Sequence, residues 1–369
     1  MTYAALLKWA AHELNDAGIE GARREAELLL AYTLGIRRED LYLRNPLSEV
    51  QADAAGKAGG AASADAATAT VRFQEVVARR AAREPLAYIT GAKEFYGLTF
   101  AVDQRVLIPR PETELLVELC LEHLERRSGG KLSCEQHSSA GCGSQREQYS
   151  VAHAPFVVAD ICTGSGAVGI AVAVNRPDVS VLASDISAAA LEVAAGNAQR
   201  HGVSERIVFA QGDLFAPWKS WKSWKSWKSW QSSPSSPSPP NAGDGDRHLM
   251  DRAINHPTKC VMNRIVDHPM DVILCNPPYI PQYEIATLQP EVRDYEPRQA
   301  LEAGADGLAF YRRLLSQAGT FLNQDGLLLM EIGYGQQDAV LRMAHENGWK
   351  ASTIPDLAGI ARVVAAQRV

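Results

Sequence analysis

The sequence predicts an α/β protein in which helices cover both faces of a mostly parallel β-sheet. Three observations lead to this fold class. Short apolar runs alternate with helical segments from residue 156 onward, a glycine-rich turn joins the first run to a helix, and the N-terminal part shows helical periodicity instead. We therefore expect a small helical domain (1–90), a linking β-hairpin (91–111) and an α/β domain (112–369).

The N-terminal domain is predicted to consist of short helices. Gly18 and Gly35 suit helix ends. Residues 54–70 are rich in Ala and Gly and predict a loop or a poorly packed helix, and a helix resumes at 71–83. Apolar residues recur at helical spacing in two sets: Leu6, Leu7, Ala10, Ala11 and Leu14, then Ala26, Leu29, Leu30 and Leu34.

The segment that follows predicts a hairpin and then a helix. EFYGLTFAV (94–102) mixes apolar and polar residues around a glycine, as hairpins do. Pro109 and Pro111 disfavour a helix before them, whereas Glu112 and Glu114 favour a helix N-terminus at this point. We expect residues 109–114 either to cover the site as an ordered segment or only to link the domains.

The α/β part contains six strand-like runs, with helices expected up to Asn175 and at 191–201. Ligands of such sheets bind beyond the carboxyl ends of the strands, near the point where the strand order reverses. Two polar stretches, 128–154 and 218–270, read as inserted loops. The strand-like runs are 156–161, 179–186, 206–215, 271–280, 326–335 and 361–369.

Composition excludes several classes of protein. Of the 369 residues, 46% are hydrophobic and 22% are charged, and the net charge of −6 gives no overall attraction to nucleic acid or anionic membranes. No run approaches the ~20 apolar residues of a membrane span, and the N-terminus lacks a signal-peptide layout. The six cysteines form no CxxC pair, which favours a reducing cytoplasm. Cys134, His137 and Cys142 lack a fourth ligand at a usual spacing, so we expect no metal site.

The turn DICTGSGAVG places Gly164-x-Gly166-x-x-Gly169 between a strand and a helix. Asp185 ends the next strand, 21 residues after Gly164 (185 − 164). Glycines let a backbone approach a ligand closely, and a carboxylate at this place can accept both ribose hydroxyls. The pattern predicts a nucleotide-type cofactor, either a nicotinamide dinucleotide or S-adenosylmethionine. The alternative is a tight turn in which Asp185 caps the following helix.

Asn276-Pro277-Pro278-Tyr279 follows the apolar run Val272–Cys275. The prolines end the strand and fix its backbone, which holds the Asn276 side chain and the Pro277 carbonyl at the edge where ligands bind. A planar –NH2 group can donate one hydrogen to each of these acceptors while Tyr279 packs on its face. Such orientation contributes up to ~7–11 kcal/mol to catalysis. The alternative is an ordinary strand-ending turn.

These motifs resemble the class I S-adenosylmethionine-dependent methyltransferases, and most of the chain resembles the HemK/PrmC family of peptide chain release factor N5-glutamine methyltransferases. The most specific block is VLIPRPETELLVE behind a helical N-terminal domain, whereas NPPY alone also occurs in methyltransferases of adenine N6 and guanine N2. Further blocks follow in order: REPLAYITGAKEFYGLTF, TGSGAVGIA, SDIS, GDLF, NPPYIP, YEPRQALEAGADGL and EIGYGQ.

The resemblance implies a Rossmann-like, seven-stranded, mostly parallel sheet and transfer of a methyl group to the glutamine of a release factor's GGQ motif, with the helical domain docking the release factor. It implies Asn276, Pro277 and Tyr279 as catalytic residues. It implies S-adenosylmethionine binding by Cys162, Thr163, Gly164, Ser165, Gly166, Asp185, Leu214 and Asn276, and glutamine binding by Asn276, Pro277, Pro278 and Tyr279. We expect a monomer that acts in the cytoplasm.

One residue departs from the family pattern, since Cys162 stands where these enzymes usually have glycine. Two interpretations stay open: its Cβ crowds the methionine part of the cofactor, or its φ is negative and a cysteine is harmless there.

Three other functions remain as alternatives. A methyltransferase of nucleic-acid bases needs a basic surface that the net charge does not predict. A nicotinamide oxidoreductase leaves NPPY without a role. A non-enzymatic nucleic-acid-binding protein would act through WKSWKSWKSWKSW (Trp218–Trp230), whose tryptophans and lysines could stack on bases. A three-residue period forms no single stripe on an α-helix, so we expect this tract to be a loop without nucleic-acid contact.

Overall fold

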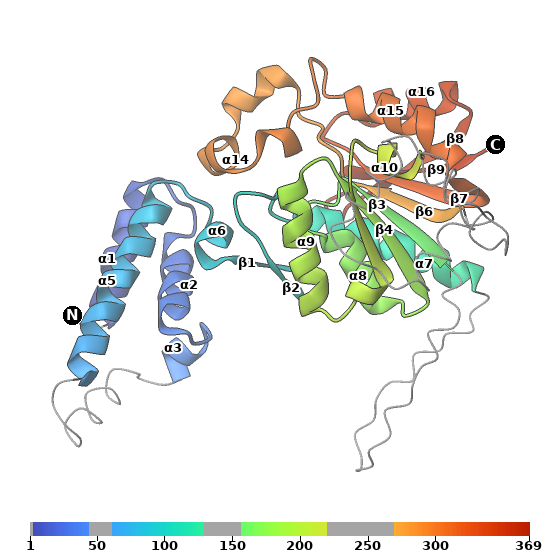
Figure 1. Ribbon diagram of the computed structural model, residues 1–369. Helices are drawn as coiled ribbons and strands as arrows, with labels where there is room; N and C mark the ends of the chain where they lie inside the picture. Colours follow the sequence, from blue (N-terminus) through green and yellow to red (C-terminus); the bar gives the residue numbers. More distant parts are fainter. Residues whose placement is uncertain (1–2, 44–60, 129–155, 220–268) are drawn as a thin grey trace, which may run out of the picture. The chain divides into compact units, whose positions relative to one another are not determined.

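The computed structural model describes residues 3–43, 61–128, 156–219 and 269–369, and the chain divides into two compact units (Figure 1). The helical unit comprises Met1–Ala92, Val102–Gln104 and Thr287–Glu296. The sheet unit comprises Lys93–Ala101, Arg105–Ala286 and Pro297–Val369. Both units are therefore discontinuous in sequence.

In the helical unit, the longer helices pack around one apolar core. The buried core includes Leu14, Leu29 and Phe73, and Trp9 meets Phe73 edge to face with ring centroids 6.3 Å apart. Most of the positions predicted from helical spacing are buried, which confirms the periodicity argument. The helices are α1 (Tyr3–Asp16), α2 (Ala22–Leu34), α3 (Asp40–Leu43), α5 (Ala61–Ala81), α6 (Leu86–Thr90) and α14 (Pro290–Tyr295).

Helix α5 begins earlier than the sequence predicts. The Ala/Gly-rich composition of 54–70 gives little amphipathic signal, yet residues from Ala61 onward continue into the predicted helix 71–83. Alanine has the highest helix propensity, so the stretch extends a helix whose apolar face begins only near Phe73. Residues 54–60 lie outside the described residues.

An ion-pair cluster ties α14 to the helices at the start of the chain. The Arg80 guanidinium is only 6% exposed; its Nε donates to Glu25 at 2.5 Å and its Nη1 to Glu291 at 2.9 Å. Arg83 donates to the other Glu291 oxygen at 2.7 Å. Removing one partner of a buried pair typically costs about 3–5 kcal/mol. Glu291 therefore contributes to the stability of the helical unit, although it lies some two hundred residues further along the chain than Arg80 and Arg83.

The sheet unit contains a seven-stranded sheet in the order β5-β4-β3-β6-β7-β9-β8. The first five of these are parallel, and β9 pairs antiparallel with both β7 and β8. This confirms the α/β class and the mostly parallel sheet. The strands are β3 (Phe156–Ile161), β4 (Val179–Asp185), β5 (Ile207–Gln211), β6 (Met270–Cys275), β7 (Leu322–Glu331), β8 (Trp349–Pro355) and β9 (Ala361–Arg368).

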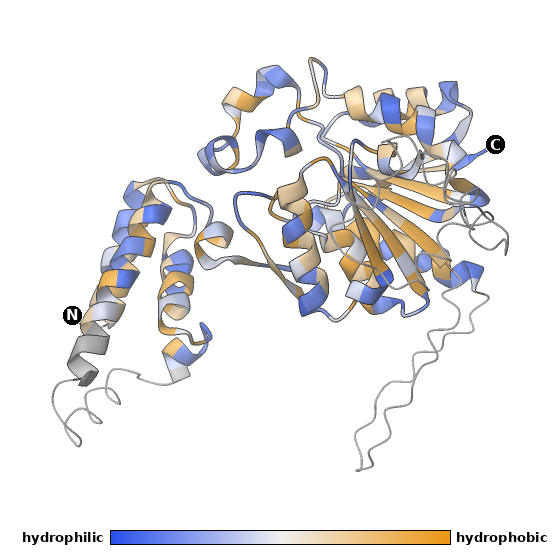
Figure 2. Ribbon diagram, viewed as in Figure 1, coloured by the Kyte–Doolittle hydropathy of each residue, from blue (hydrophilic) through white to orange (hydrophobic). Residues whose placement is uncertain are grey.

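Helices form a layer on each face of this sheet (Figure 1). Within β3, Val158 faces the first layer whereas Val157 and Ala159 face the second, as the pleat requires. Strands buried on both faces are continuously apolar, as Figure 2 shows. The first layer is α7 (Glu114–Arg127), α8 (Ala167–Asn175) and α9 (Ala188–Arg200), and the second is α10 (Ala216–Lys219), α15 (Ala309–Gln317) and α16 (Gln337–Glu346).

The predicted hairpin forms from β1 (Ala92–Phe95) and β2 (Leu98–Ala101). A buried side chain on α9, Asn197, fastens it: Asn197 Oδ1 accepts from the Ala101 N–H at 2.8 Å, and Nδ2 donates to the Ala101 carbonyl at 3.0 Å. The same Nδ2 donates to the Ser165 carbonyl at 2.9 Å. Asn197 therefore connects the hairpin to the glycine-rich turn.

The two expected insertions lie mostly outside the described residues. Described structure reaches into both ends of 218–270, because Trp218 belongs to α10 and is buried, and Met270 begins β6. Residues 220–268, with the rest of the Trp/Lys tract, and residues 129–155, with Cys134, His137 and Cys142, are not described. Within the described ranges, no helix has both the length and the apolar character needed to cross a lipid bilayer.

Candidate active site

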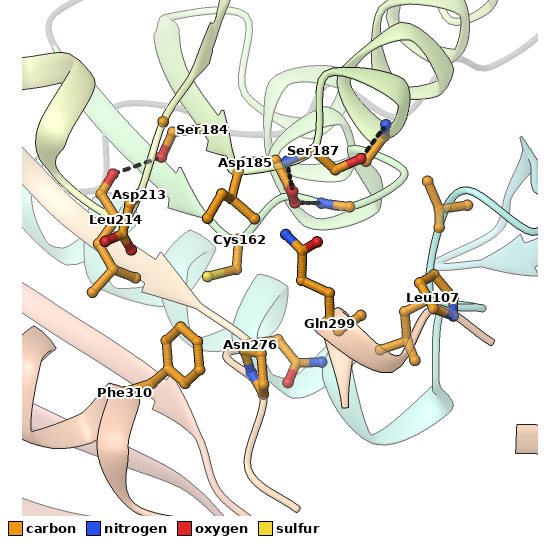
Figure 3. Close-up of a pocket in the computed structure, with 18 of the residues that line it drawn as sticks. Leu107, Cys162, Ser184, Asp185, Ser187, Asp213, Leu214, Asn276, Gln299 and Phe310 are labelled. Carbon is orange, nitrogen blue, oxygen red and sulfur yellow. Dashed lines mark hydrogen bonds between the residues drawn. The ribbon is translucent and has the colours of Figure 1, made fainter. Parts of the chain in front are cut away.

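A cavity lies at the carboxyl ends of β3, β4 and β6 in the sheet unit (Figure 3). Strands β3 and β6 are adjacent, with Ile161 opposite Cys275, and the chain order reverses between them. This is the switch point at which α/β sheets bind ligands. The cavity wall includes Leu107, Cys162, Gly164, Asp185, Leu214, Asn276, Pro278, Gln299 and Phe310.

Buried Asp160 shapes the glycine-rich turn. One oxygen, Oδ2, accepts from Thr163 Oγ1 at 2.6 Å and from the Gly169 N–H at 2.9 Å, which folds the turn around it. Burial raises the pKa of Asp160 to about 6, while these two hydrogen bonds lower it. A side chain at Gly169 would place its Cβ 2.9 Å from Asp160 Oδ2, so this glycine is required for packing.

Gly164 and Gly166 serve different purposes. Gly164 has φ +55°, no atom lies within 4 Å of the place a Cβ would take, and the residue lies on the cavity wall. Its exposed backbone can therefore meet a ligand closely. Gly166 has φ +81°, and a Cβ there would lie 2.7 Å from Ile170 and 3.1 Å from the Ala194 side chain, so it lets α8 and α9 pack.

Asp185 turns its carboxylate to the cavity from the end of β4. Its Oδ2 accepts from the Gly164 N–H and its Oδ1 from the Ser187 N–H, both at 2.9 Å. Burial raises the pKa of Asp185, and these backbone donors lower it. Ser187, not Asp185, is the N-cap of α9, because Ser187 Oγ accepts from the Ala190 N–H at 3.1 Å. Each carboxylate oxygen retains lone-pair capacity for a further donor.

Cys162 and Leu214 have left-handed backbones, with φ of +62° and +49°. The interpretation that Cys162 has a negative φ is therefore wrong. Its side chain points into the cavity from the end of β3 (Figure 3). Leu214 is held in place by its carbonyl, which accepts from buried Ser184 Oγ at 3.1 Å. Strained backbone of this kind concentrates at ligand sites.

The strain at Cys162 gives a stability prediction. A Cβ in the left-handed region destabilises the folded state by roughly 1–2 kcal/mol. Glycine's extra freedom in the unfolded chain offsets about 0.4–1 kcal/mol of the stability gained by removing that Cβ. Cys162→Gly should therefore raise the free energy of unfolding by up to about 1 kcal/mol. The melting temperature of the sheet unit's transition should rise by about 2–4 °C, measured by calorimetry. Cys162→Val, which is β-branched, should lower it; a lower melting temperature for the glycine variant would contradict the strain.

The NPPY residues divide between the cavity wall and the layer behind it. Asn276 and Pro278 line the cavity, whereas Pro277 is buried and Tyr279 is largely buried. The Tyr279 carbonyl accepts from Gln336 Nε2 at 2.9 Å, and Gln336 Oε1 accepts from the Gly333 N–H at 3.0 Å. Burial raises the pKa of Tyr279 to about 12, so its phenol stays neutral. Asn276 Nδ2 donates to Thr113 Oγ1 at 3.1 Å.

The structure thus brings Cys162, Gly164, Asp185, Leu214, Asn276 and Pro278 to one cavity. Among the other predicted site residues, Thr163, Ser165 and Gly166 are buried in the turn beneath the wall.

Several wall residues were missed from the sequence. Leu107 lies within VLIPRPETELLVE, Gln299 lies within YEPRQALEAGADGL, and Phe310 comes two residues after that block. The signal available was their place in or next to these blocks. Nothing in the local pattern shows that these side chains reach the same cavity.

The arrangement suits binding of a nucleoside-like ligand beside a hydrogen-bond acceptor. Apolar side chains, the Asp185 carboxylate, the open backbone of Gly164 and the Asn276 amide all line the same cavity. The described part of the chain contains no cluster of three His, Cys, Asp or Glu side chains able to hold a metal ion.

Comparisons with known proteins find relatives of nearly the whole chain. The profile of the PrmC N-terminal domain matches residues 5–58 and 66–91, and that of the methyltransferase small domain matches residues 150–223. The chain is 34% identical over 366 residues to the release factor glutamine methyltransferase of Geobacter sulfurreducens, covering 98% of this chain and 95% of the relative. It is 33% identical over 370 residues to the enzyme of that name from Moorella thermoacetica, covering 100% and 99%.

Solved structures resemble the chain more distantly. The ribosomal protein L11 methylase of Lactobacillus delbrueckii subsp. bulgaricus aligns with a TM-score of 0.36 at 18% identity, covering 71% of this chain and 82% of that one. The human Mettl16 catalytic domain, solved with an RNA hairpin, aligns with a TM-score of 0.44 at 13% identity, covering 80% and 82%.

Proposed function

The chain belongs to the release factor glutamine methyltransferases, and from this we propose that it transfers a methyl group from S-adenosylmethionine to the side-chain amide nitrogen (N5) of the glutamine in the GGQ motif of peptide chain release factors. One observation of the site carries the proposal: Asp185 and Asn276 lie on the wall of the same cavity, so a cofactor and an amide acceptor can meet there. The three cysteines of the described residues are free thiols, which suits the cytoplasm, where we place the reaction.

The cavity residues fit S-adenosylmethionine. Asp185 can accept both ribose hydroxyls, because each of its oxygens keeps lone-pair capacity beyond its backbone hydrogen bond. The open backbone of Gly164 and the turn 162–166 receive the amino-acid part, and Leu214 packs on the base. S-Adenosylmethionine supplies an electrophilic methyl group on a positively charged sulfur. Cys162 lies beside the methionine part, where its Cβ takes space that glycine would leave open.

The NPPY residues hold the glutamine side chain that receives the methyl group. The Asn276 Oδ1 and the Pro277 carbonyl accept the two hydrogens of the glutamine –NH2 group, and Tyr279 packs against its plane. Because an amide lone pair is delocalised, the nitrogen is a poor nucleophile, and fixing its direction removes much of the entropic barrier. The buried prolines make this geometry rigid before the substrate arrives.

The glutamine nitrogen forms a bond to the methyl carbon while the sulfur–carbon bond breaks and its electron pair stays on sulfur. The nitrogen then releases one proton to the solvent. The products are N5-methylglutamine and S-adenosylhomocysteine.

The helical unit is the part that we propose docks the release factor. Its helices match the PrmC N-terminal domain, and their surface carries charged side chains outside the apolar core. We propose that the enzyme acts as a monomer and that neither a membrane nor nucleic acid takes part.

The test uses S-adenosylmethionine with a tritiated methyl group. The full-length enzyme is incubated separately with a release factor, with its GGQ→GGA variant and with bulk RNA. We expect label on the release factor, none on the GGA variant and none on RNA. Label on RNA but not on the release factor would overturn the proposed substrate in favour of a nucleic-acid base.

A further inference from the structure

A buried chain of hydrogen bonds stands behind the Asn276 amide. Thr113 Oγ1 donates to Glu331 Oε2 at 2.6 Å, and Asn276 Nδ2 donates to Thr113 Oγ1 at 3.1 Å. Thr113 is 4% exposed and Glu331 is 2% exposed. Water is therefore excluded from the bond between Thr113 and Glu331, whereas the bond to Asn276 is partly buried.

Three separate elements bring these side chains together. Thr113 ends the short 3₁₀ helix η1 (Pro111–Thr113) within IPRPETE, Asn276 follows β6, and Glu331 is the last residue of β7. Strands β6 and β7 pair with Cys275 opposite Met330, so the next residues, Asn276 just beyond β6 and Glu331 at the end of β7, lie side by side. The threonine fits between them.

The number of protons that each side chain carries fixes which group donates and which accepts in these hydrogen bonds. A hydroxyl group carries one proton, and Thr113 gives it to the Glu331 carboxylate. Thr113 can therefore only accept from Asn276, which requires the –NH2 end of that amide to face Thr113. The opposite amide orientation would place two oxygen atoms against each other. The carbonyl end of Asn276 is consequently turned away from Thr113.

We propose that Thr113 and Glu331 are positioning residues that set which end of the Asn276 amide meets the substrate. The inference rests on the proposed function, because only an –NH2 substrate needs the oxygen of Asn276 to face it. Neither residue touches the acceptor; both act through Asn276.

The ionisation state of Glu331 decides whether the three side chains keep these donor and acceptor roles. Burial raises the pKa of Glu331 to about 7, Glu112 raises it further, and Thr113, Arg362 and Arg110 lower it. The phenols of Tyr279 and Tyr311 also face the carboxylate and stay neutral, because burial raises the pKa of each. A protonated Glu331 can donate to Thr113, which frees the Thr113 proton for Asn276 and allows the amide to turn over.

The donor and acceptor roles predict the direction in which kcat should change with pH. The productive orientation needs ionised Glu331, so kcat should fall as the pH decreases through about 7 and level off above it. Loss of the Thr113 hydroxyl removes a hydrogen bond that lowers the pKa of Glu331. It also breaks the link between Glu331 and Asn276, so a variant without that hydroxyl should show no decrease in kcat near pH 7.

The experiment compares Thr113→Val, Thr113→Ser and Glu331→Gln with the wild-type enzyme, using release factor and labelled donor. Thr113→Val keeps the shape but removes the hydroxyl, and it should lower kcat roughly 10- to 100-fold with an unchanged Kd for the donor. Thr113→Ser should restore most of the rate. Glu331→Gln should show a smaller loss and no decrease in kcat near pH 7. Thr320→Val in the sheet unit removes a hydroxyl bonded to the Gln317 carbonyl at a residue that does not line the cavity; it is the matched control and should leave kcat unchanged.

The outcomes separate the two proposals. An inactive wild-type enzyme on release factor refutes the proposed function. If the wild-type enzyme is active, two results would overturn the positioning role alone. One is a Thr113→Val variant as fast as wild type, and the other is equally slow Thr113→Val and Thr113→Ser variants. If Thr113→Val does not fold by circular dichroism, the pH profile of Glu331→Gln decides: an unchanged decrease near pH 7 overturns the inference, and its disappearance supports it.

Discussion

Replacing Asn276 by alanine is expected to lower kcat for release-factor methylation by roughly 10²–10³-fold, because it removes a preorganised acceptor that orients the attacking nitrogen. The donor's Kd should change little, since Asp185 and the turn 162–166 make the proposed contacts to the ribose and the amino-acid part. Single-turnover kinetics with labelled donor measure the first quantity, and isothermal titration calorimetry measures the second.

Asn276→Asp is the matched control for this prediction. It keeps the side chain's shape and its acceptor oxygen but replaces the –NH2 donor with a second acceptor. The Thr113 hydroxyl has one proton and cannot satisfy this carboxylate and Glu331 together. We therefore expect a loss of rate comparable with that of alanine. Turnover at the wild-type rate in Asn276→Ala would show that Asn276 does not orient the glutamine amide, whereas the wild-type rate in Asn276→Asp would show that the –NH2 group of Asn276 is not needed.

Replacing Asp185 by alanine is expected to weaken donor binding by at least roughly 100-fold, because hydrogen bonds to a charged group contribute about 1.5–3 kcal/mol each and the proposed ribose contact has two. The backbone N–H groups of Gly164 and Ser187 would also lose their acceptor, which loosens the turn. Calorimetric titration of S-adenosylmethionine and of S-adenosylhomocysteine measures the effect.

Two further variants sharpen the test of Asp185. Asp185→Asn retains one acceptor oxygen and should show an intermediate Kd. Asp178→Asn removes a carboxylate of the same sheet unit whose partner is Arg176 at 2.7 Å and which is not among the residues lining the cavity. Its donor affinity should equal that of the wild-type enzyme. Equal affinities for Asp185→Ala and Asp178→Asn would refute the assignment of the ribose site.

The sequence predicts the parallel strands well, because a strand buried on both faces is a continuous apolar run. Edge strand β8 was missed for the converse reason. Only Trp349 at its start is fully buried, and the strand pairs with β9 alone, so WKASTIP has neither a continuous run nor a clean alternation. The early start of α5 was hidden by composition, since the Ala/Gly-rich sequence of 54–70 gives little amphipathic signal.

The site divides in the same way. The glycine-rich turn, Asp185 and NPPY are local motifs whose positions at strand ends follow from the strand pattern. The hydrogen bond between Thr113 and Glu331 joins residues 218 positions apart. No periodicity or spacing predicts such a pair, because it depends on strand register and on the path of a turn. The backbone strain at Cys162 was equally hidden, since the sequence allows either sign of φ.

The position of α14 bears on how such an enzyme can be divided or recombined. Arg80 is buried against Glu25 and Glu291, and Glu291 belongs to a segment encoded long after the N-terminal helices. A gene fragment that ends after residue 92 would therefore produce helices with an arginine lacking one of its two carboxylates. Exchange of N-terminal domains between relatives at a single crossover would also separate Arg80 and Arg83 from their own Glu291. Chimeras should need two coordinated exchanges, one at the N-terminus and one at residues 287–296, because the helical unit contains both segments.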